Sequence, residues 1–112
     1  MDGKSRAEIP AKLPRAVVKK LQHCAAQAYT VLECSGMARV DFLVQQNGKY
    51  YLNELNTIPG FTSISMYPKL WEKSGVPYPV LIDRLIQYAM ELHAEKRKLK
   101  TFYTPKSDWY KQ

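Results

Sequence analysis

Four polar residues in the middle of the chain, Arg39, Asp41, Glu54 and Asn56, could together bind a metal ion and an anion. The oxygen atoms of Asp, Glu and Asn are hard ligands that suit magnesium, manganese or calcium better than zinc. Magnesium takes one or two carboxylates and completes its shell with water and substrate phosphates. These residue types therefore favour chemistry on a phosphorylated ligand.

The segment that follows these residues could hold an anion. Gly60 allows the backbone to approach a charged group closely, and Pro59 stiffens the turn before it. Thr62, Ser63 and Ser65 offer hydroxyl groups where a helix is expected to begin, and free amides at a helix start bind carboxylate or phosphate. Ordinary N-capping by these hydroxyls is the alternative.

A β-hairpin is expected to position the four polar residues. Residues 38–46 and 49–55 are rich in β-branched and aromatic side chains. Asn47-Gly48 between them is a strong signal for a two-residue hairpin turn. The sequence therefore predicts an antiparallel ribbon over these two segments.

A two-residue turn would place Asp41 opposite Glu54 and Arg39 opposite Asn56, all on one face of the ribbon. Two carboxylates directly opposite each other, with Cβ atoms about 5 Å apart, repel, and a bound cation would relieve that repulsion better than Arg39 alone. The alternative is a solvated strand face on which Arg39 pairs with Asp41 or Glu54. A slip of one residue in the register would move every side chain to the other face.

The same register divides the apolar residues of the strands between the two faces. On the face opposite the carboxylates, where a core would lie, we expect Val40, Phe42, Val44, Tyr51 and Leu55. Leu43 and Leu52 would lie beside the carboxylates, which indicates that this face is partly covered as well.

Three helices are expected around the ribbon. Apolar residues recur at helical spacing over residues 14–34, and Gly36 would end that helix. A short helix should begin near Ser65 and end before Gly75, and a last helix with an apolar stripe follows Pro79.

These elements predict an α+β fold in which an antiparallel hairpin packs with about three helices. They occupy residues 14–95. Residues 1–13 are expected to be an irregular lead-in, and residues 96–112 a basic, flexible tail.

Composition excludes several classes of protein. The formal net charge of +7 is concentrated near expected helix ends and comes without a nucleic-acid motif, so no nucleic-acid partner is expected. No apolar run reaches the roughly 20 residues needed to cross a bilayer, and no signal segment is visible, so we expect no membrane partner and a cytoplasmic location. Cys24 and Cys34 are expected to be free thiols.

Three runs of residues resemble a known family: ARVDF from residue 38, NELNTIPGFTS from residue 53 and SMYP from residue 65. Together they are similar to the carboxy-terminal signature of D-alanine–D-alanine ligases. That resemblance implies the carboxy-terminal part of an ATP-grasp domain. It also implies the ATP-dependent joining of two D-alanines through an acyl phosphate, for peptidoglycan synthesis in the bacterial cytoplasm.

The resemblance implies a role for each polar residue of the ribbon. Asp41, Glu54 and Asn56 match ligands of Mg²⁺ or Mn²⁺, and Glu54 would bridge two ions between the phosphates of ATP. Glu54 and Asn56 would thereby also contribute to nucleotide binding. Arg39 matches the arginine that contacts the transferred phosphoryl group and the tetrahedral intermediate.

The resemblance also implies roles for the following loop. The amide of Gly60 matches the backbone donor to the oxyanion of the intermediate. Ser65 and Met66 match the positions that hold the carboxylate of the second D-alanine.

The implied partners are D-alanine, ATP and further domains. Complete ligases of this kind carry amino-terminal and central domains, so this chain is expected to be inactive alone. They are typically homodimers, so a homodimer is a possible assembly. One alternative is another ATP-grasp carboxylate–amine ligase, including the D-alanine–D-lactate type. A second is a non-catalytic basic module that binds nucleic acid or an acidic partner. The second alternative leaves the opposed carboxylates unexplained.

Overall fold

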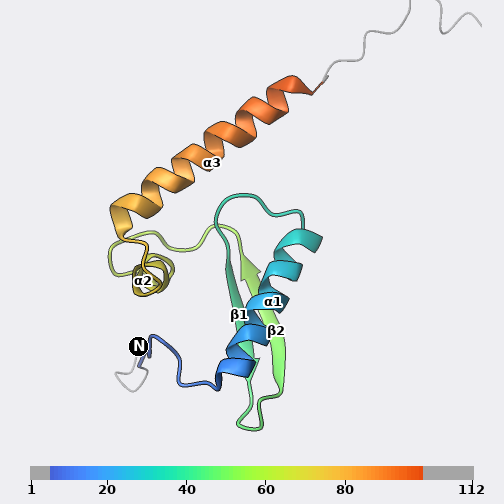
Figure 1. The fold of residues 1–112 in the computed structure, drawn as a ribbon, viewed down its shortest axis with the longest axis vertical. Coiled ribbons are helices and arrows are strands. Elements are labelled where there is room, and N and C mark those ends of the chain that lie inside the picture. Colours follow the sequence, from blue (N-terminus) through green and yellow to red (C-terminus); the bar gives the residue numbers. More distant parts are fainter. Residues whose placement is uncertain (1–5, 100–112) are drawn as a thin grey trace, which may run out of the picture.

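A two-stranded antiparallel ribbon and three helices make up residues 6–99, the part of the chain that the computed structural model describes (Figure 1). In chain order the elements are α1 (Arg15–Val31), β1 (Arg39–Val44), β2 (Tyr50–Asn56), α2 (Met66–Lys73) and α3 (Tyr78–Lys98). The predicted α+β class, a hairpin with three helices, is confirmed. None of these helices is long and apolar enough to cross a membrane.

Helix α1 is shorter than predicted. It ends at Val31 rather than at residue 34, because Glu33 adopts the left-handed conformation (φ 53°) that ends the helix. Gly36, the predicted stop, is also left-handed (φ 74°) but lies in the loop beyond. The hydroxyl of Tyr29 donates to the carbonyl oxygen of Gly36 at 2.9 Å, so this loop folds back on the helix.

Helix α3 extends beyond residue 95, the predicted end of the folded elements. Lys96, Arg97 and Lys98 form its last turn, whereas the sequence assigned them to a flexible tail. Cationic side chains at a helix carboxyl end suit the helix dipole. The part of the predicted tail beyond residue 99 lies outside the described residues.

The turn of the ribbon has three residues, not the predicted two. The amide of Gln45 donates to the carbonyl of Lys49 at 2.8 Å, and the amide of Gly48 donates to the carbonyl of Gln45 at 2.9 Å. A two-residue Asn-Gly turn needs a positive φ at both residues, but here only Gly48 (φ 85°) has one. The side chain of Asn47 instead accepts the Lys49 amide at 2.9 Å.

A β-bulge restores the predicted pairing at the far end of the ribbon. The longer turn shifts the register by one residue, and Phe42 accordingly pairs with Leu52. Between that pair and Asp41 lies a register shift that leaves Asn53 as an extra residue on β2. Beyond it Asp41 pairs with Glu54, as the sequence predicted.

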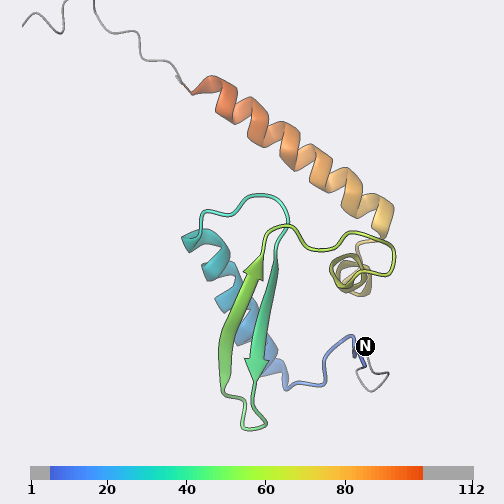
Figure 2. The ribbon, with the colours of Figure 1, turned by 180° about the vertical axis from the view of Figure 1, so that it is seen from behind.

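The changed register near the turn corrects the predicted faces. Tyr50, not Tyr51, shares a face with Phe42, and their ring centroids lie 6.1 Å apart. Tyr51 pairs with Leu43, and Leu43 is 60% exposed, so the predicted cover over this side is wrong for the described chain. Leu52, predicted beside the carboxylates, pairs with Phe42. Helix α1 lies across the ribbon and packs on β2 (Figure 2).

The buried hydrophobic side chains of the described residues lie where α2 packs on α3. Tyr67 and Leu81 are only 6% and 4% exposed. The ring of Phe61, from the loop before α2, lies 5.9 Å from that of Tyr67 and 5.5 Å from that of Tyr78. Burial raises the pKa of Tyr67. This small aromatic core joins the loop to both helices.

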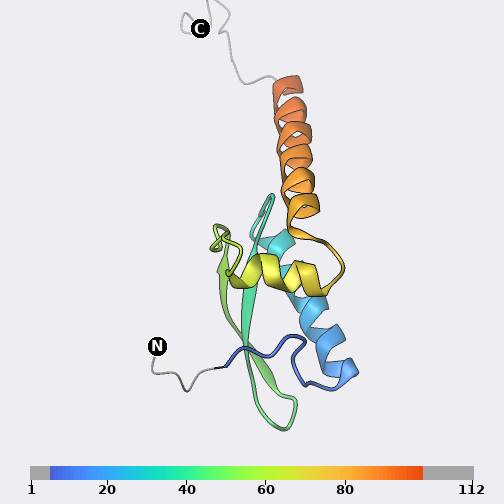
Figure 3. The same ribbon diagram turned by 90° about the vertical axis from the view of Figure 1, so that its left-hand side faces the viewer.

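The described chain is elongated. Its radius of gyration is 20.2 Å, whereas a compact chain of this length has about 13 Å. Helix α3 projects away from the ribbon (Figure 3). Several large apolar side chains are left exposed, including Ile58, Ile64 and Met90. The described helices and strands therefore leave these apolar side chains uncovered.

Candidate functional site

Arg39 lies between the two carboxylates at the open end of the ribbon. Its Nε and one terminal nitrogen donate to the two carboxylate oxygens of Asp41, at 3.0 and 3.1 Å. The same terminal nitrogen lies 3.8 Å from Oε1 of Glu54. The three charged side chains therefore lie together, and the arginine engages one carboxylate with two bonds and the other at longer range. The solvated-face alternative predicts the same pairing, so a metal site here stays a prediction.

Hydrogen bonding within this cluster shifts two pKa values in opposite directions. The guanidinium of Arg39 donates to the ionised carboxylate of Asp41 and lowers its pKa, although partial burial acts the other way. The same hydrogen bond raises the pKa of Arg39. Both groups are therefore firmly charged at neutral pH.

Asn56 pairs with Arg39 across the ribbon, as predicted, but its amide oxygen is already engaged. That oxygen accepts a hydrogen bond from the backbone amide of Ile58 at 2.9 Å. This contact turns the chain from the end of β2 into the following loop. This local role was not predicted from the sequence, although an Asn at the start of a loop is a known signal for such a turn.

The donor set fits a cation that keeps ligands from outside the protein. In residues 6–99 no three His, Cys, Asp or Glu side chains gather as a metal site. Asp41, Glu54 and the oxygen of Asn56 supply hard ligands, which suit magnesium with additional water and phosphate ligands and do not suit zinc. Glu54 is the more accessible carboxylate, since its side chain is 59% exposed against 32% for Asp41.

The loop after β2 closes tightly around Ser65. A Cβ atom added at Gly60 would lie 3.1 Å from Oγ of Ser65, so a side chain at this position would crowd the serine hydroxyl. The amide of Thr62 donates to the same oxygen at 3.0 Å, and Oγ1 of Thr62 lies 2.7 Å from it. Gly60 thus leaves room for the serine hydroxyl, and its close approach to an anion stays a prediction.

Ser65 occupies the N-cap position of α2 without capping it. Its side chain makes no hydrogen bond to an amide of the helix, so the N-capping alternative is wrong for this residue. Pro68 has no amide, and the amide of Lys69 bonds the carbonyl of Ser65. Helix geometry leaves the amides of Met66 and Tyr67 without a partner inside α2, and they lie beside the Ser65 hydroxyl in the chain.

One contact of this loop was not visible in the sequence. The hydroxyl of Tyr78, at the start of α3, donates to the carbonyl oxygen of Phe61 at 3.2 Å. The only feature of the sequence that points to this contact is the position of Tyr78 between Pro77 and Pro79.

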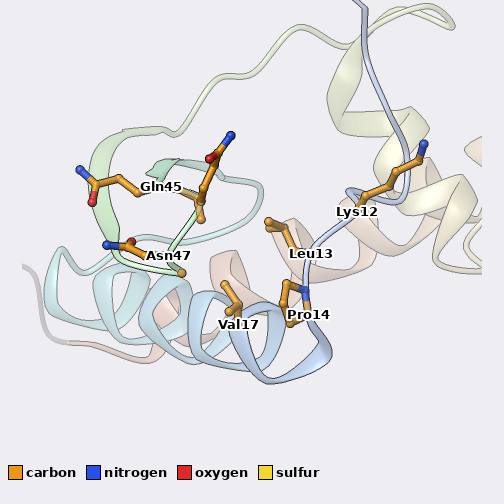
Figure 4. Close-up of a pocket in the computed structure, with 9 residues that line it drawn as sticks. Lys12, Leu13, Pro14, Val17, Gln45 and Asn47 are labelled. Atoms are coloured by element: carbon orange, nitrogen blue, oxygen red, sulfur yellow. The ribbon is translucent and has the colours of Figure 1, made fainter.

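A separate cavity of about 420 Å³ lies at the turn end of the ribbon (Figure 4). It is lined by residues of the lead-in, the start of α1 and the turn, among them Lys12, Leu13 and Gln45. None of the residues predicted for the site lines it. The charged cluster and the loop around Ser65 are therefore the candidate site.

The chain belongs to a ligase family. The family model described as "D-ala D-ala ligase C-terminus" matches residues 1–87. The resemblance of the three sequence runs is thereby confirmed, and with it the assignment to the carboxy-terminal part of this ATP-grasp fold.

Curated relatives agree with this family. The D-alanine–D-alanine ligase of Caldicellulosiruptor bescii is 52% identical over 101 residues, which cover 89% of this chain and 28% of the relative. That of Coxiella burnetii is 53% identical over 95 residues, covering 85% of this chain and 26% of the relative. The chain thus spans about a quarter of the length of these relatives.

Solved structures show the same fold. The Coxiella burnetii D-alanine–D-alanine ligase matches 79% of this chain and 25% of its own, with a TM-score of 0.77 and 53% identity. The Bacillus anthracis ligase complexed with ATP matches 76% of this chain and 30% of its own, with a TM-score of 0.70 and 33% identity. The D-Ala:D-Ser ligase VanG of Enterococcus faecalis matches 76% of this chain and 26% of its own, with a TM-score of 0.68 and 34% identity.

Proposed function

We propose that this chain is the metal- and phosphate-binding part of an ATP-dependent D-alanine–D-alanine ligase that supplies peptidoglycan synthesis in the cytoplasm. The observation that carries the proposal is the opposed pair of Asp41 and Glu54, with Arg39 against both, directly before the loop that closes on Ser65. The free thiols of Cys24 and Cys34 agree with a reducing compartment. Further domains would supply the sites for the first D-alanine and for adenine, and homodimer formation remains a prediction.

The open end of the ribbon would handle the phosphates. Asp41, Glu54 and Asn56 would hold Mg²⁺ or Mn²⁺, which when bound neutralises charge on the phosphates of ATP. Arg39 would stabilise the negative charge of the transferred phosphoryl group, because its guanidinium stays protonated and lies beside the residues that would hold the metal. These roles require Asp41 to be ionised, and its lowered pKa supports that.

The loop and the start of α2 would handle the carboxyl groups. The amide of Gly60 would donate to the oxyanion that forms when the amine of the second D-alanine attacks the acyl phosphate. The hydroxyl of Ser65 and the amide of Met66 would hold the carboxylate of that second D-alanine, at the positive end of the helix dipole. Phosphate would then leave and the peptide bond remain.

The proposal is tested by adding what the relatives have in addition. The Caldicellulosiruptor bescii ligase is truncated to its amino-terminal portion, so that the part that matches this chain is removed. This portion is then mixed or co-expressed with the chain. We expect phosphate release that depends on ATP, Mg²⁺ and D-alanine, with neither part active alone. A well-folded chain that restores no release would contradict the proposal.

A further inference from the structure

The peptide group between Phe61 and Thr62 is held from both sides. Its carbonyl oxygen accepts the hydroxyl of Tyr78 at 3.2 Å, and its amide donates to Oγ of Ser65 at 3.0 Å. A peptide group is planar, so the direction of its carbonyl fixes the direction of its amide. A contact on one side therefore orients the contact on the other.

Tyr78 is well placed to act as the fixed end of this arrangement. Pro77 and Pro79 flank it, with Pro77 as the N-cap of α3 and Pro79 in the first turn. Proline restricts the backbone on both sides. The ring of Tyr78 lies 5.5 Å from that of Phe61, with 39° between the planes, so the tyrosine is held by packing as well as by its backbone.

The hydroxyl of Ser65 has little freedom left. The amide of Thr62 occupies one acceptor position of its oxygen, and Oγ1 of Thr62 lies 2.7 Å away. Gly60 lies on another side of this oxygen, where a Cβ atom would come within 3.1 Å of it. A shift of the Phe61–Thr62 peptide would therefore turn the serine hydroxyl.

We propose that Tyr78 is a positioning residue for the carboxylate-binding end of the loop. Its hydroxyl fixes the Phe61–Thr62 peptide, and the Thr62 amide in turn orients the Ser65 hydroxyl toward a substrate carboxylate. The link to a substrate carboxylate rests on the proposed function. The chain of hydrogen bonds is tested in the protein itself.

The first test measures amide exchange by NMR. Tyr78→Phe removes the hydroxyl and keeps the ring, and Tyr88→Phe, at an exposed tyrosine of the same helix, is the matched control. We expect the exchange rate of the Thr62 amide to rise about fivefold in Tyr78→Phe and to stay unchanged in Tyr88→Phe. An unchanged rate at Thr62 in a Tyr78→Phe variant with native exchange in α3 would overturn the proposal.

The second test uses the enzyme assembled with the amino-terminal portion. We expect Tyr78→Phe to raise KM for the second D-alanine about fivefold while kcat changes by less than about twofold. A merely structural role would reduce the amount of folded enzyme, and so kcat, without raising KM. An unchanged KM would therefore overturn the link to the substrate. If the assembled wild type releases no phosphate, the proposed function fails, while the exchange comparison still decides the role of Tyr78 in the loop.

Discussion

The two halves of the candidate site are held in different ways. At the open end of the ribbon, Arg39, Asp41 and Glu54 are partly exposed and are aligned by backbone pairing. Around the loop, Phe61 is held by aromatic packing against Tyr67, a buried side chain of α2. The ribbon sets which charges meet, and the packing sets where the loop lies. Substitutions in the two regions should therefore have different consequences.

The largest effect on stability is expected from a leucine in the packed region. Leu81 is 4% exposed, and truncation to alanine leaves a cavity, so Leu81→Ala should lower the free energy of unfolding by about 3 kcal/mol. Leu43→Ala, on the exposed side of the ribbon, should change it by less than about 0.5 kcal/mol. Urea unfolding followed by tryptophan fluorescence compares them. Equal losses would show that the ribbon is packed as tightly as the helices.

A glycine pair separates function from stability. Gly60→Ala would place its Cβ 3.1 Å from the Ser65 oxygen, and the small displacement of the hydroxyl should lower the rate of phosphate release in the assembled enzyme about tenfold. Gly36→Ala meets no neighbouring atom but strains a left-handed residue, which should cost about 1 kcal/mol of stability and leave the rate nearly unchanged. Steady-state rates and urea midpoints measure both. A Gly60→Ala enzyme with a normal rate would show that the loop tolerates displacement.

The smallest effect is the pH dependence of the ribbon cluster. The pKa of Asp41 is lower in the folded chain than the ordinary value of about 3.9, so the unfolded state binds more protons. Its stabilising contribution is complete above that ordinary value and is lost as pH falls through the folded pKa. We expect acid to lower the free energy of unfolding less steeply in Arg39→Gln than in the wild type. Arg84→Gln, from α3, is the control, and identical acid profiles for Arg39→Gln and the wild type would contradict the role of Arg39.

The pairing of the polar residues could be predicted from the sequence because side chains alternate between the faces of a strand and Asn47-Gly48 marks the turn, which together limit the possible registers. The predicted alignment of Asp41 with Glu54 is confirmed, although the turn has a different length. The turn type depends on the φ of Asn47, and a bulge at Asn53 is not encoded in apolar alternation. Two local deviations cancel at the site, and the faces near the turn, where they do not cancel, were predicted wrongly.

The arrangement of the loop could not be predicted in the same way. The hydrogen bond from Tyr78 to Phe61 joins residues 17 positions apart, and no periodicity relates them. Ser65 carries the residue type of an N-cap, yet its hydroxyl turns to Thr62 because Gly60 leaves space there. Local residue type predicted where the helix begins, and tertiary contact decided which partner the hydroxyl takes.

The assignment of the ribbon as a metal and phosphate site is tested most directly by removing the charge of Glu54. In the assembled enzyme, Glu54→Gln keeps the shape of the side chain and removes the charge that metal and phosphate chemistry requires. We expect it to lower the rate of D-alanine-dependent phosphate release by at least about a hundredfold. Glu91→Gln, at an exposed glutamate of α3, should change the rate by less than about twofold. A Glu54→Gln enzyme that releases phosphate at the rate of Glu91→Gln would contradict the assignment of this ribbon as the metal and phosphate site.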